Sequence, residues 1–242
     1  MHSLSVESML LERVRRYAMP DGPVACRSFQ LRQSGEIRLA PDEPWLRFEA
    51  EQWFDAAGLD FRWTARARIG RILPVTVVDA FEGGHGFLSV RIAGVVPVAR
   101  ARGPEVDRGE VLRALAELPW RPTGFSSGSN APQLAWSVAS PHTRAPDTPA
   151  FDTLRATFDD GTTRCYVDLE VDAEGRVLSA GAPDRPRGLG KTFVPTPWRG
   201  TFADYKPYDG LRVPTRAEVA WLLPGGPFTY FRGRVTDYRI VR

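Results

Sequence analysis

The chain has 242 residues, 43% of them hydrophobic and 25% charged, which is ordinary for a soluble globular protein. Its net charge is only +3, and its arginines are interleaved with acidic residues, which argues against a nucleic-acid partner. No segment has the length and apolarity of a membrane-spanning helix, and the first residues lack the basic start and apolar run of a signal peptide. We therefore expect a cytoplasmic protein without an integral membrane segment.

Cysteine and histidine are too sparse to build a metal centre. The two cysteines, Cys26 and Cys165, lie far apart in the sequence, which leaves open whether they pair. The three histidines, at positions 2, 85 and 142, form no Cys/His cluster with zinc-binding spacing. The sequence also lacks a P-loop and a dinucleotide-binding fingerprint, so we expect neither a metal nor a cofactor.

The N-terminal segment 1–20 carries the first predicted helix, at residues 5–18. Apolar residues recur three and four positions apart, at Val6, Leu10, Val14 and Tyr17. Ser5 is a suitable N-cap, and the PDGP stretch at residues 20–23 ends the helix.

Residues 28–106 form the first predicted strand group. Segments rich in aromatic and β-branched residues, separated by turn residues, lie at 28–39, 45–54, 59–69, 72–81 and 86–99. Residues 61–69 alternate between apolar and polar types, which is the period of a strand with one buried and one wet face. Short turns between neighbouring strands indicate an antiparallel meander, in which arginines of one strand can face glutamates of the next.

One predicted helix, at residues 107–118, interrupts the strands. Its apolar stripe consists of Val111, Leu112, Leu115 and Leu118. Asp107 stands at the N-cap position with Glu110 three residues later, which resembles a capping box. Arg113 and Glu117 can pair one turn apart, and Pro119 ends the helix.

Residues 119–150 are loop-rich with one strand at 133–139, and residues 151–242 form the second strand group. Strands are predicted at 151–158, 163–171 and 176–180, then a loop at 181–190 and three or four long strands. No repeat or linker divides the chain, so we expect a single domain over 1–242. The predicted fold is mainly β: one strongly curved antiparallel sheet of roughly ten to twelve strands, a half-barrel or open barrel. The 107–118 helix should cover its concave side, and the N-terminal helix should close an edge.

The stretch GFSSG at residues 124–128 satisfies the G-x-S-x-G pattern of a hydrolase nucleophile elbow. Such an elbow requires a strand before the serine and a helix after it, with an acidic residue and then a histidine further along the chain. Ser126 instead follows a Pro-rich loop, and no acidic residue lies between Ser126 and His142. We therefore expect a Gly-rich loop that can serve as a lid, and no hydrolase.

Three titratable residues are candidates for proton transfer: Glu117, Asp79 and His85. Glu117 ends the predicted helix, where its side chain either pairs with Arg113 at the surface or points into a cavity, and burial there would raise its pKa. His85 follows a Gly-Gly turn; a turn histidine is usually solvated, although its ordinary pKa suits proton transfer.

The chain contains seven tryptophans, and core packing is the simplest explanation for any one of them. Together they suit a curved sheet whose concave side holds an apolar guest, because aromatic rings supply large contact areas at fixed geometry. The expected lining residues are Trp53, Trp63, Trp120, Trp198, Trp221 and Tyr230.

Several stretches resemble a bacterial family known only as a domain of unknown function. They are GEIRL, WLRFEAEQWF, FRWTARARIG and ARGPEVDRGEVLRALAELPWRP in the first half, and residues 196–241 in the second. The family pattern includes a helix that ends in an Ala-Glu-x-x-Trp-x-Pro turn, which matches residues 116–122 here. The order of strands, mid-chain helix and a return strand with Gly210 and Pro214 is also similar to lipoprotein carriers of the LolA type. That likeness implies an unclosed antiparallel barrel wrapped around helices, with an apolar cavity.

Three functions fit these features. The first is binding of a hydrophobic small molecule or lipid between the concave face and the 107–132 helix and loop. The second is a cofactor-independent enzyme, of the isomerase or cyclase type, that acts on a hydrophobic metabolite in the same cavity, with Glu117, Asp79 or His85 as acid or base. The third is a structural or partner-binding domain. The oligomeric state stays open.

Overall fold

A computed structural model describes residues 5–70, 72–126, 133–139, 151–190 and 192–242, which form a 13-stranded antiparallel sheet and two α-helices. The first strand group is Ser28–Ile37 (β1), Leu46–Asp55 (β2), Phe61–Ile69 (β3), Leu73–Glu82 (β4), His85–Ile92 (β5) and Val96–Ala101 (β6). The second is Leu134–Val138 (β7), Asp152–Asp159 (β8), Arg164–Val171 (β9), Val177–Leu189 (β10), Thr192–Tyr208 (β11), Leu211–Leu223 (β12) and Gly226–Val241 (β13).

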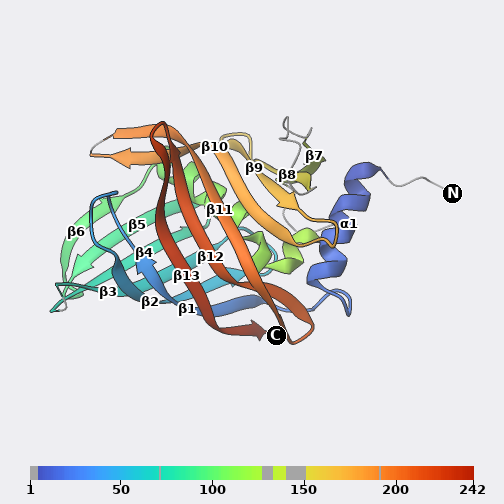
Figure 1. The fold of residues 1–242 in the computed structure, drawn as a ribbon, viewed down its shortest axis with the longest axis horizontal. Coiled ribbons are helices and arrows are strands. Elements are labelled where there is room, and N and C mark those ends of the chain that lie inside the picture. Colours follow the sequence, from blue (N-terminus) through green and yellow to red (C-terminus); the bar gives the residue numbers. More distant parts are fainter. Residues whose placement is uncertain (1–4, 71, 127–132, 140–150, 191) are drawn as a thin grey trace.

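The sheet is a curled half-barrel with helix α2 (Pro104–Ala116) on its concave side (Figure 1). The strand order is β6-β5-β4-β3-β2-β1-β13-β12-β11-β10-β9-β8-β7, so each group is a meander and β1 pairs with β13 in the middle. The predicted fold class is confirmed. The strand count exceeds the prediction because residues 86–99 hold two strands, β5 and β6, separated by a turn in which Ala93 and Gly94 both have positive φ.

Five hairpin turns meet at one end of the half-barrel, which we call the open end. These are the turns that follow β1, β3, β5, β10 and β12, and they meet because β1 and β13 run antiparallel with Ile37 opposite Phe231. The open end is on the left in Figure 1, and helix α1 (Val6–Ala18) lies at the opposite end. Ser5 is the N-cap of α1, as predicted, and the helix packs against the edge strand β7 and its neighbour β8.

The start of α2 differs from the prediction. The helix begins at Pro104 with Gly103 as N-cap, because a proline at the first helical position supplies a suitable φ and needs no hydrogen-bond acceptor. Asp107 therefore lies inside the first turn, where its Oδ1 accepts a hydrogen bond of 2.6 Å from the Gly86 amide of β5. The predicted cap is instead a contact that ties the helix to the sheet.

Gly86 permits this contact, because a Cβ atom at this position would lie 2.7 Å from the carbonyl oxygen of Val106. We expect Gly86→Ala to destabilise the fold by about 1–3 kcal/mol, since the helix backbone would have to move. Gly109 on the same helix has nothing within 4 Å of its Cβ position, so Gly109→Ala should stabilise the helix by up to about 1 kcal/mol. Urea unfolding of the two variants tests this difference, and a loss of stability in both would contradict it.

Residues 181–189 form a strand, whereas the sequence predicts a loop at 181–190. They continue β10, whose pairing with β11 shifts register between Ala182 and Arg185. Prolines are tolerated in strands at such irregularities and along unpaired edges. Pro183 lies in the register shift, and Pro186 lies beyond Gly181, where the pairing of β10 with β9 ends. A bulge also re-aims the side chains beside it, which matters for Arg185 below.

Two separate hydrophobic clusters lie on the concave side. The larger one joins both helices to the sheet and includes Leu112, Leu115 and Leu118, each 0% exposed. The smaller one comprises Phe48, Ala50, Trp63 and Ala65, with Ile37, Ala67, Val77 and Phe231 packed against it. We call these eight residues the apolar wall.

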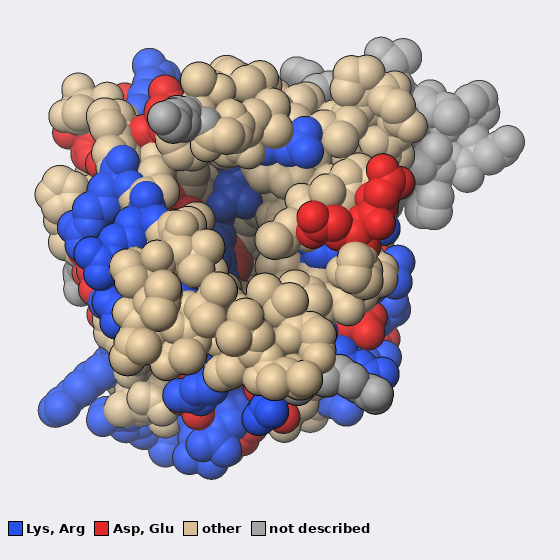
Figure 2. Space-filling model, turned by 90° about the vertical axis from the view of Figure 1, so that its left-hand side faces the viewer, with Lys and Arg blue, Asp and Glu red and all other residues tan. Residues whose placement is uncertain are grey.

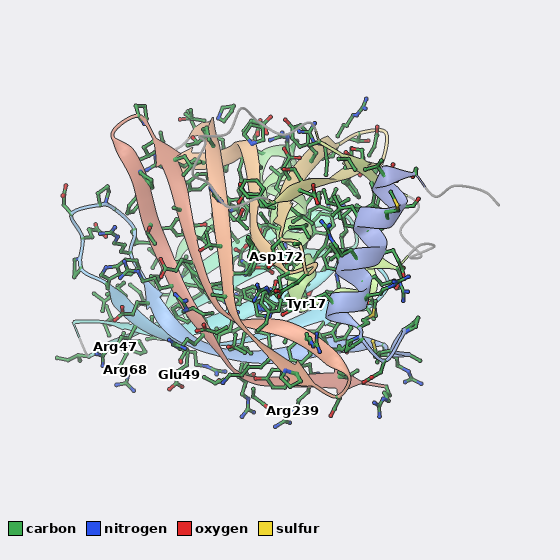
Figure 3. All side chains as sticks on the ribbon, turned by 45° about the vertical axis from the view of Figure 1, so that its right-hand side comes forward. Tyr17, Arg47, Glu49, Arg68, Asp172 and Arg239 are labelled. Carbon is green, nitrogen blue, oxygen red and sulfur yellow. The ribbon has the colours of Figure 1, made fainter. Side chains whose placement is uncertain are left out.

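The outer face of the sheet is polar. Figure 3 shows Arg47, Glu49, Arg68 and Arg239 pointing away from the strands. Arginine and acidic side chains face each other across neighbouring strands as predicted, for example Arg62 and Glu82 at 2.6 Å. In the described part of the chain, no helix is long and apolar enough to cross a membrane.

Two short 3-10 helices, Leu118–Trp120 and Pro122–Phe125, occupy the start of the predicted loop and bury Phe125. Ser126 therefore follows a 3-10 turn rather than a strand, as expected if GFSSG is not a nucleophile elbow. The rest of that stretch, the proposed lid at 127–132 and the predicted loop at 140–150 lie outside the described residues.

Candidate functional site

Three charged residues recur along one face of α2 and its C-cap: Glu110, Arg113 and Glu117. Arg113 is the centre of the group. Its Nε donates to Glu117 Oε1 at 2.8 Å, and its Nη1 donates to Asp79 Oδ2 of β4. The other oxygen of Glu117 accepts a bond of 2.6 Å from Gln52 Nε2 of β2. The helix thus contacts two strands of the wall through one buried ionic network.

Aromatic rings lie under the Arg113 guanidinium, whose carbon is 4.9 Å from the centroid of Phe61 and 5.3 Å from that of Trp63. Trp63 is held in turn by a hydrogen bond of 2.9 Å from its Nε1 to Gln33 Oε1. Burial would lower the pKa of Arg113, but Glu117, Asp79 and Glu110 outweigh it and raise that pKa. Arg113 is a permanent cation with every carboxylate of the network close to it.

Glu110 is the unusual acid of the group. Burial is the main cause that raises its pKa to about 8, and the Asp79 carboxylate adds to this, while Arg185 and Arg113 act in the opposite direction. Among the described residues, Glu110 Oε2 and Asp79 Oδ1 are buried oxygens without a hydrogen-bond partner. A proton on Glu110 removes this conflict, because its O–H can donate to Asp79. We infer that Glu110 is neutral at pH 7.

Arg185 lies in a cage of aromatic side chains near Glu110. Its guanidinium carbon is 4.7 Å from the ring centroid of Trp198 and 5.7 Å from that of Trp221. Tyr230 stacks on Trp221 at 5.8 Å and accepts a hydrogen bond of 3.0 Å from Trp198 Nε1. Arg185 directly follows the register shift in β10, and Tyr230 lies within the register shift between β12 and β13. Two bulges therefore bring the two side chains together.

The open end of the half-barrel is hollowed (Figure 2). Figure 2 looks onto that end and shows a hollowed face with basic and acidic atoms inside it. The side chains of the five charged residues of the cluster remain between 9% and 16% exposed, so they border accessible space. They are Asp79, Glu110, Arg113, Glu117 and Arg185.

The rim of the open end is apolar. Large hydrophobic side chains at its turns are each at least 39% exposed: Leu39, Ile69, Ile72, Leu73, Val95, Val96, Leu189, Phe193, Val194 and Leu222. Exposed apolar surface on this scale is typical of a site that meets a ligand, a membrane or another protein.

The predicted acids are only partly brought together. Glu117 and Asp79 meet at Arg113, so both belong to the cluster. His85 does not: at the first residue of β5 its side chain is 79% exposed, with Nδ1 at 3.8 Å from Asp107 Oδ2.

The predicted lining residues divide into three groups. Trp63, Trp198 and Trp221 are on the concave side of the sheet, and Tyr230 contacts two of them. Trp120 is 4% exposed in the main core, where its Nε1 donates to the Pro214 carbonyl. Trp53 lies on the outer face beside Arg62, because strand alternation puts it on the same side as Glu51. It does not face the hollow.

Sequence reasoning misses Glu110 and Arg185. Glu110, Arg113 and Glu117 are spaced as a charged helical stripe, which normally faces solvent, and only the enclosure of α2 by the curled sheet buries it. Arg185 is hidden in a stretch rich in proline and glycine that reads as a loop. The sequence did offer one signal. The helix is expected to lie on the concave side of the sheet, so charged residues along one of its faces would be enclosed there.

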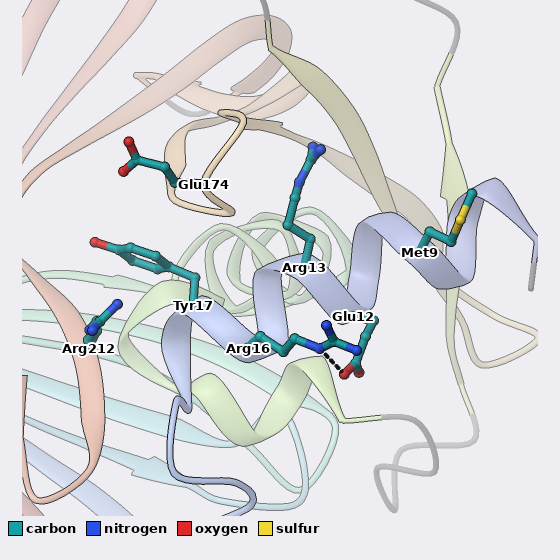
Figure 4. Close-up of a pocket in the computed structure, with 7 residues that line it drawn as sticks. All are labelled: Met9, Glu12, Arg13, Arg16, Tyr17, Glu174 and Arg212. Carbon is teal, nitrogen blue, oxygen red and sulfur yellow. Dashed lines mark hydrogen bonds and ion pairs between the residues drawn. The ribbon is translucent and has the colours of Figure 1, made fainter.

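A second pocket, of about 650 Å³, lies beside α1 at the other end of the molecule. Figure 4 shows Tyr17 in it, between Arg212 of β12 and Glu174 of the β9–β10 turn. The cations of α1 are already paired, Arg16 with Glu12 and Arg13 with Asp152. These contacts are best explained as docking α1 onto the sheet.

Three solved structures share this fold at low sequence identity. A LolA superfamily protein from Nitrosomonas europaea is 13% identical with a TM-score of 0.55, covering 99% of this chain and 94% of that one. A putative outer membrane lipoprotein-sorting protein domain from Vibrio parahaemolyticus is 10% identical with a TM-score of 0.51, covering 95% and 91%. A DUF1329 family protein from Desulfovibrio piger is 12% identical with a TM-score of 0.53, covering 98% and 94%.

The predicted likeness to LolA-type half-barrels is therefore confirmed at the level of the fold. No curated protein matches this chain. One family model matches residues 10–233, which is most of the sequence, and its description is a family of unknown function. The chain belongs to that family, DUF6544.

Proposed function

We propose that this protein binds a hydrophobic or amphiphilic small molecule, such as a lipid, in the hollow at the open end. The observation that carries the proposal is the apolar wall, a second hydrophobic cluster separate from the main core. The wall adjoins the network through Trp63, which Arg113 contacts, so the hollow combines apolar sides with a charged interior. Sites for small molecules have this composition: mostly apolar lining with a few placed polar groups.

The apolar rim supports the same proposal, because an apolar guest would cross it to reach the wall. The fold also supports it, since similar half-barrels occur in proteins described as lipoprotein-sorting and LolA superfamily members. Fold alone does not fix function, so the proposal depends on the side chains of the hollow.

We expect Ala67→Trp to block the hollow, because Ala67 belongs to the apolar wall and an indole ring would occupy the guest's space. Titration with the neutral fluorophore N-phenylnaphthylamine measures this. We expect Ala67→Trp to bind the fluorophore at least about tenfold more weakly, because the fluorophore loses apolar contact area with the wall. Arg66→Trp is the matched control, since the neighbouring residue lies on the outer face of the same strand. Absence of saturable binding to the wild type, or equal binding by Ala67→Trp, would contradict the proposal.

A second candidate is a cofactor-independent enzyme that moves a proton on its bound molecule. The observation that favours it is the carboxyl–carboxylate pair of Glu110 and Asp79, because an acid with a pKa near neutrality suits proton transfer. Glu117 stays a candidate for the acid or base, although Arg113 and Gln52 engage both of its oxygens. Deuterium uptake from D2O into a co-purified molecule would support this function if Asp79→Asn abolishes it, and no uptake by the wild type would exclude it.

A further inference from the structure

The two arginines inside the half-barrel differ in how fully they are paired. Arg113 makes short charge-assisted bonds to Asp79 and Glu117. Arg185 has only long contacts among the described residues: 3.2 Å from Nε to the Gly109 carbonyl, 3.4 Å from Nη1 to Tyr230 Oη and 3.7 Å from Nη2 to Glu110 Oε1. Charge-assisted bonds to guanidinium groups are normally about 2.7–2.9 Å. Arg185 is therefore a nearly buried cation with donors to spare.

The charges around Arg185 explain why it lacks a strong partner. The groups that face Glu110 are Asp79 from β4, Arg185 from β10 and Arg113 from its own helix. Asp79 and Glu117 balance Arg113 and Arg185 when Glu110 carries its proton. A neutral Glu110 keeps its proton, donates a hydrogen bond to Asp79 and offers Arg185 no negative charge.

We propose that Arg185 binds the anionic group of an amphiphile, and that Glu110 in its ionised form competes with that group for the same guanidinium. This inference rests on the proposed function, since the chain of the amphiphile would lie on the apolar wall. Tyr230 of the cage is followed directly by Phe231 of the wall, which stacks on Phe48 at 5.3 Å. Arg187, 5.7 Å from the ring of Trp221, adds a second cation beside the cage.

The anionic group is a carboxylate or a phosphate, because the guanidinium fork binds both. Three probes with the same chain separate these chemistries: dodecanoate, dodecyl phosphate and neutral dodecanol, each measured by displacement of N-phenylnaphthylamine. At pH 7 we expect one of the anions to bind about ten- to hundredfold tighter than dodecanol, the contribution of a charge-assisted contact. The tighter anion identifies the class of head group.

Arg185→Gln should lower the ratio of anion affinity to dodecanol affinity by at least about tenfold. Arg199→Gln is the matched control, because Arg199 lies on the outer face, paired with Glu170, one residue away from Trp198. For the wild type, anion affinity should fall about tenfold between pH 7 and pH 9, as Glu110 ionises. In Glu110→Gln the affinity for the anion should stay constant between pH 7 and pH 9. The affinity of the wild type for dodecanol should not fall over the same range.

The outcomes separate this inference from the proposed function. Two outcomes would show that Arg185 does not bind the anionic group. In one, N-phenylnaphthylamine and dodecanol bind but the anions bind no tighter than dodecanol; in the other, Arg185→Gln still binds the anion more tightly than dodecanol. In either case the hollow remains a site for neutral guests. An equal loss of anion affinity at pH 9 in Glu110→Gln would overturn the competition by Glu110. If none of the probes binds, both the site and this inference fail.

Discussion

Replacing Arg113 with methionine should lower the free energy of unfolding by about 3–5 kcal/mol, the usual cost of removing one partner from a buried ionic network. The arginine is 15% exposed and pairs with Asp79 and Glu117, which are 16% and 12% exposed. Methionine fills much of the same volume but leaves both carboxylates without their cation in a poorly solvated place. Urea unfolding followed by far-UV circular dichroism measures the loss.

Arg62→Met is the control for this prediction. Arg62 also forms a short pair, with Glu82, but the two side chains are 45% and 42% exposed, so we expect a change of less than about 1 kcal/mol. Adding Asp79→Asn and Glu117→Gln to Arg113→Met should recover part of the stability, because those substitutions remove the orphaned charges. If Arg113→Met costs no more than Arg62→Met, the network does not hold α2 in place.

Glu110→Gln should make the protein less sensitive to rising pH. In the unfolded chain Glu110 releases its proton near pH 4.5, whereas in the fold it retains the proton to about pH 8. Between these values the folded state binds more protons, so each pH unit costs the wild type up to about 1.4 kcal/mol of stability at this residue. Below pH 4.5 the penalty is absent, and above pH 8 it is constant.

The stability difference between Glu110→Gln and the wild type should therefore grow in favour of the variant from pH 4.5 to 8, by about 3–5 kcal/mol in total. Glutamine keeps a hydrogen-bond donor for Asp79 and an acceptor towards Arg185. The variant therefore tests the effect of the ionisation of Glu110 alone. Urea midpoints at intervals across this range measure the difference. A difference that does not change with pH would show that Glu110 is ionised in the fold at neutral pH.

Local signals in the sequence were enough for the architecture. Alternation in residues 61–69 gives β3 its buried and wet faces, and turn residues mark the hairpins of the meander. The N-cap Ser5 and the Arg113–Glu117 pair depend only on nearby residues, and both are present. The prediction fails at two places. Asp107 looks like an N-cap, but the helix already begins at Pro104, and residues 181–189 look like a loop because of their prolines and glycines but form a bulged strand.

The candidate site could be predicted only in part, because it depends on contacts between distant segments. Asp79 and Glu117 were found by residue type, but the arginine that joins them was assigned to the surface. Arg185 meets Tyr230 through two register shifts that no local pattern reveals. Trp53 and Trp63 were both chosen because they are tryptophans. Alternation along β2, which puts Trp53 on the same side as Glu51, would have excluded Trp53 from the lining.

Native mass spectrometry of protein purified from its own host without detergent tests most directly whether the hollow holds a guest. We expect a fraction of the wild-type protein to carry one added mass of a hydrophobic or amphiphilic small molecule, and Ala67→Trp prepared in parallel to carry none. Bare protein in both preparations, or the same added mass on both, would contradict binding at the apolar wall.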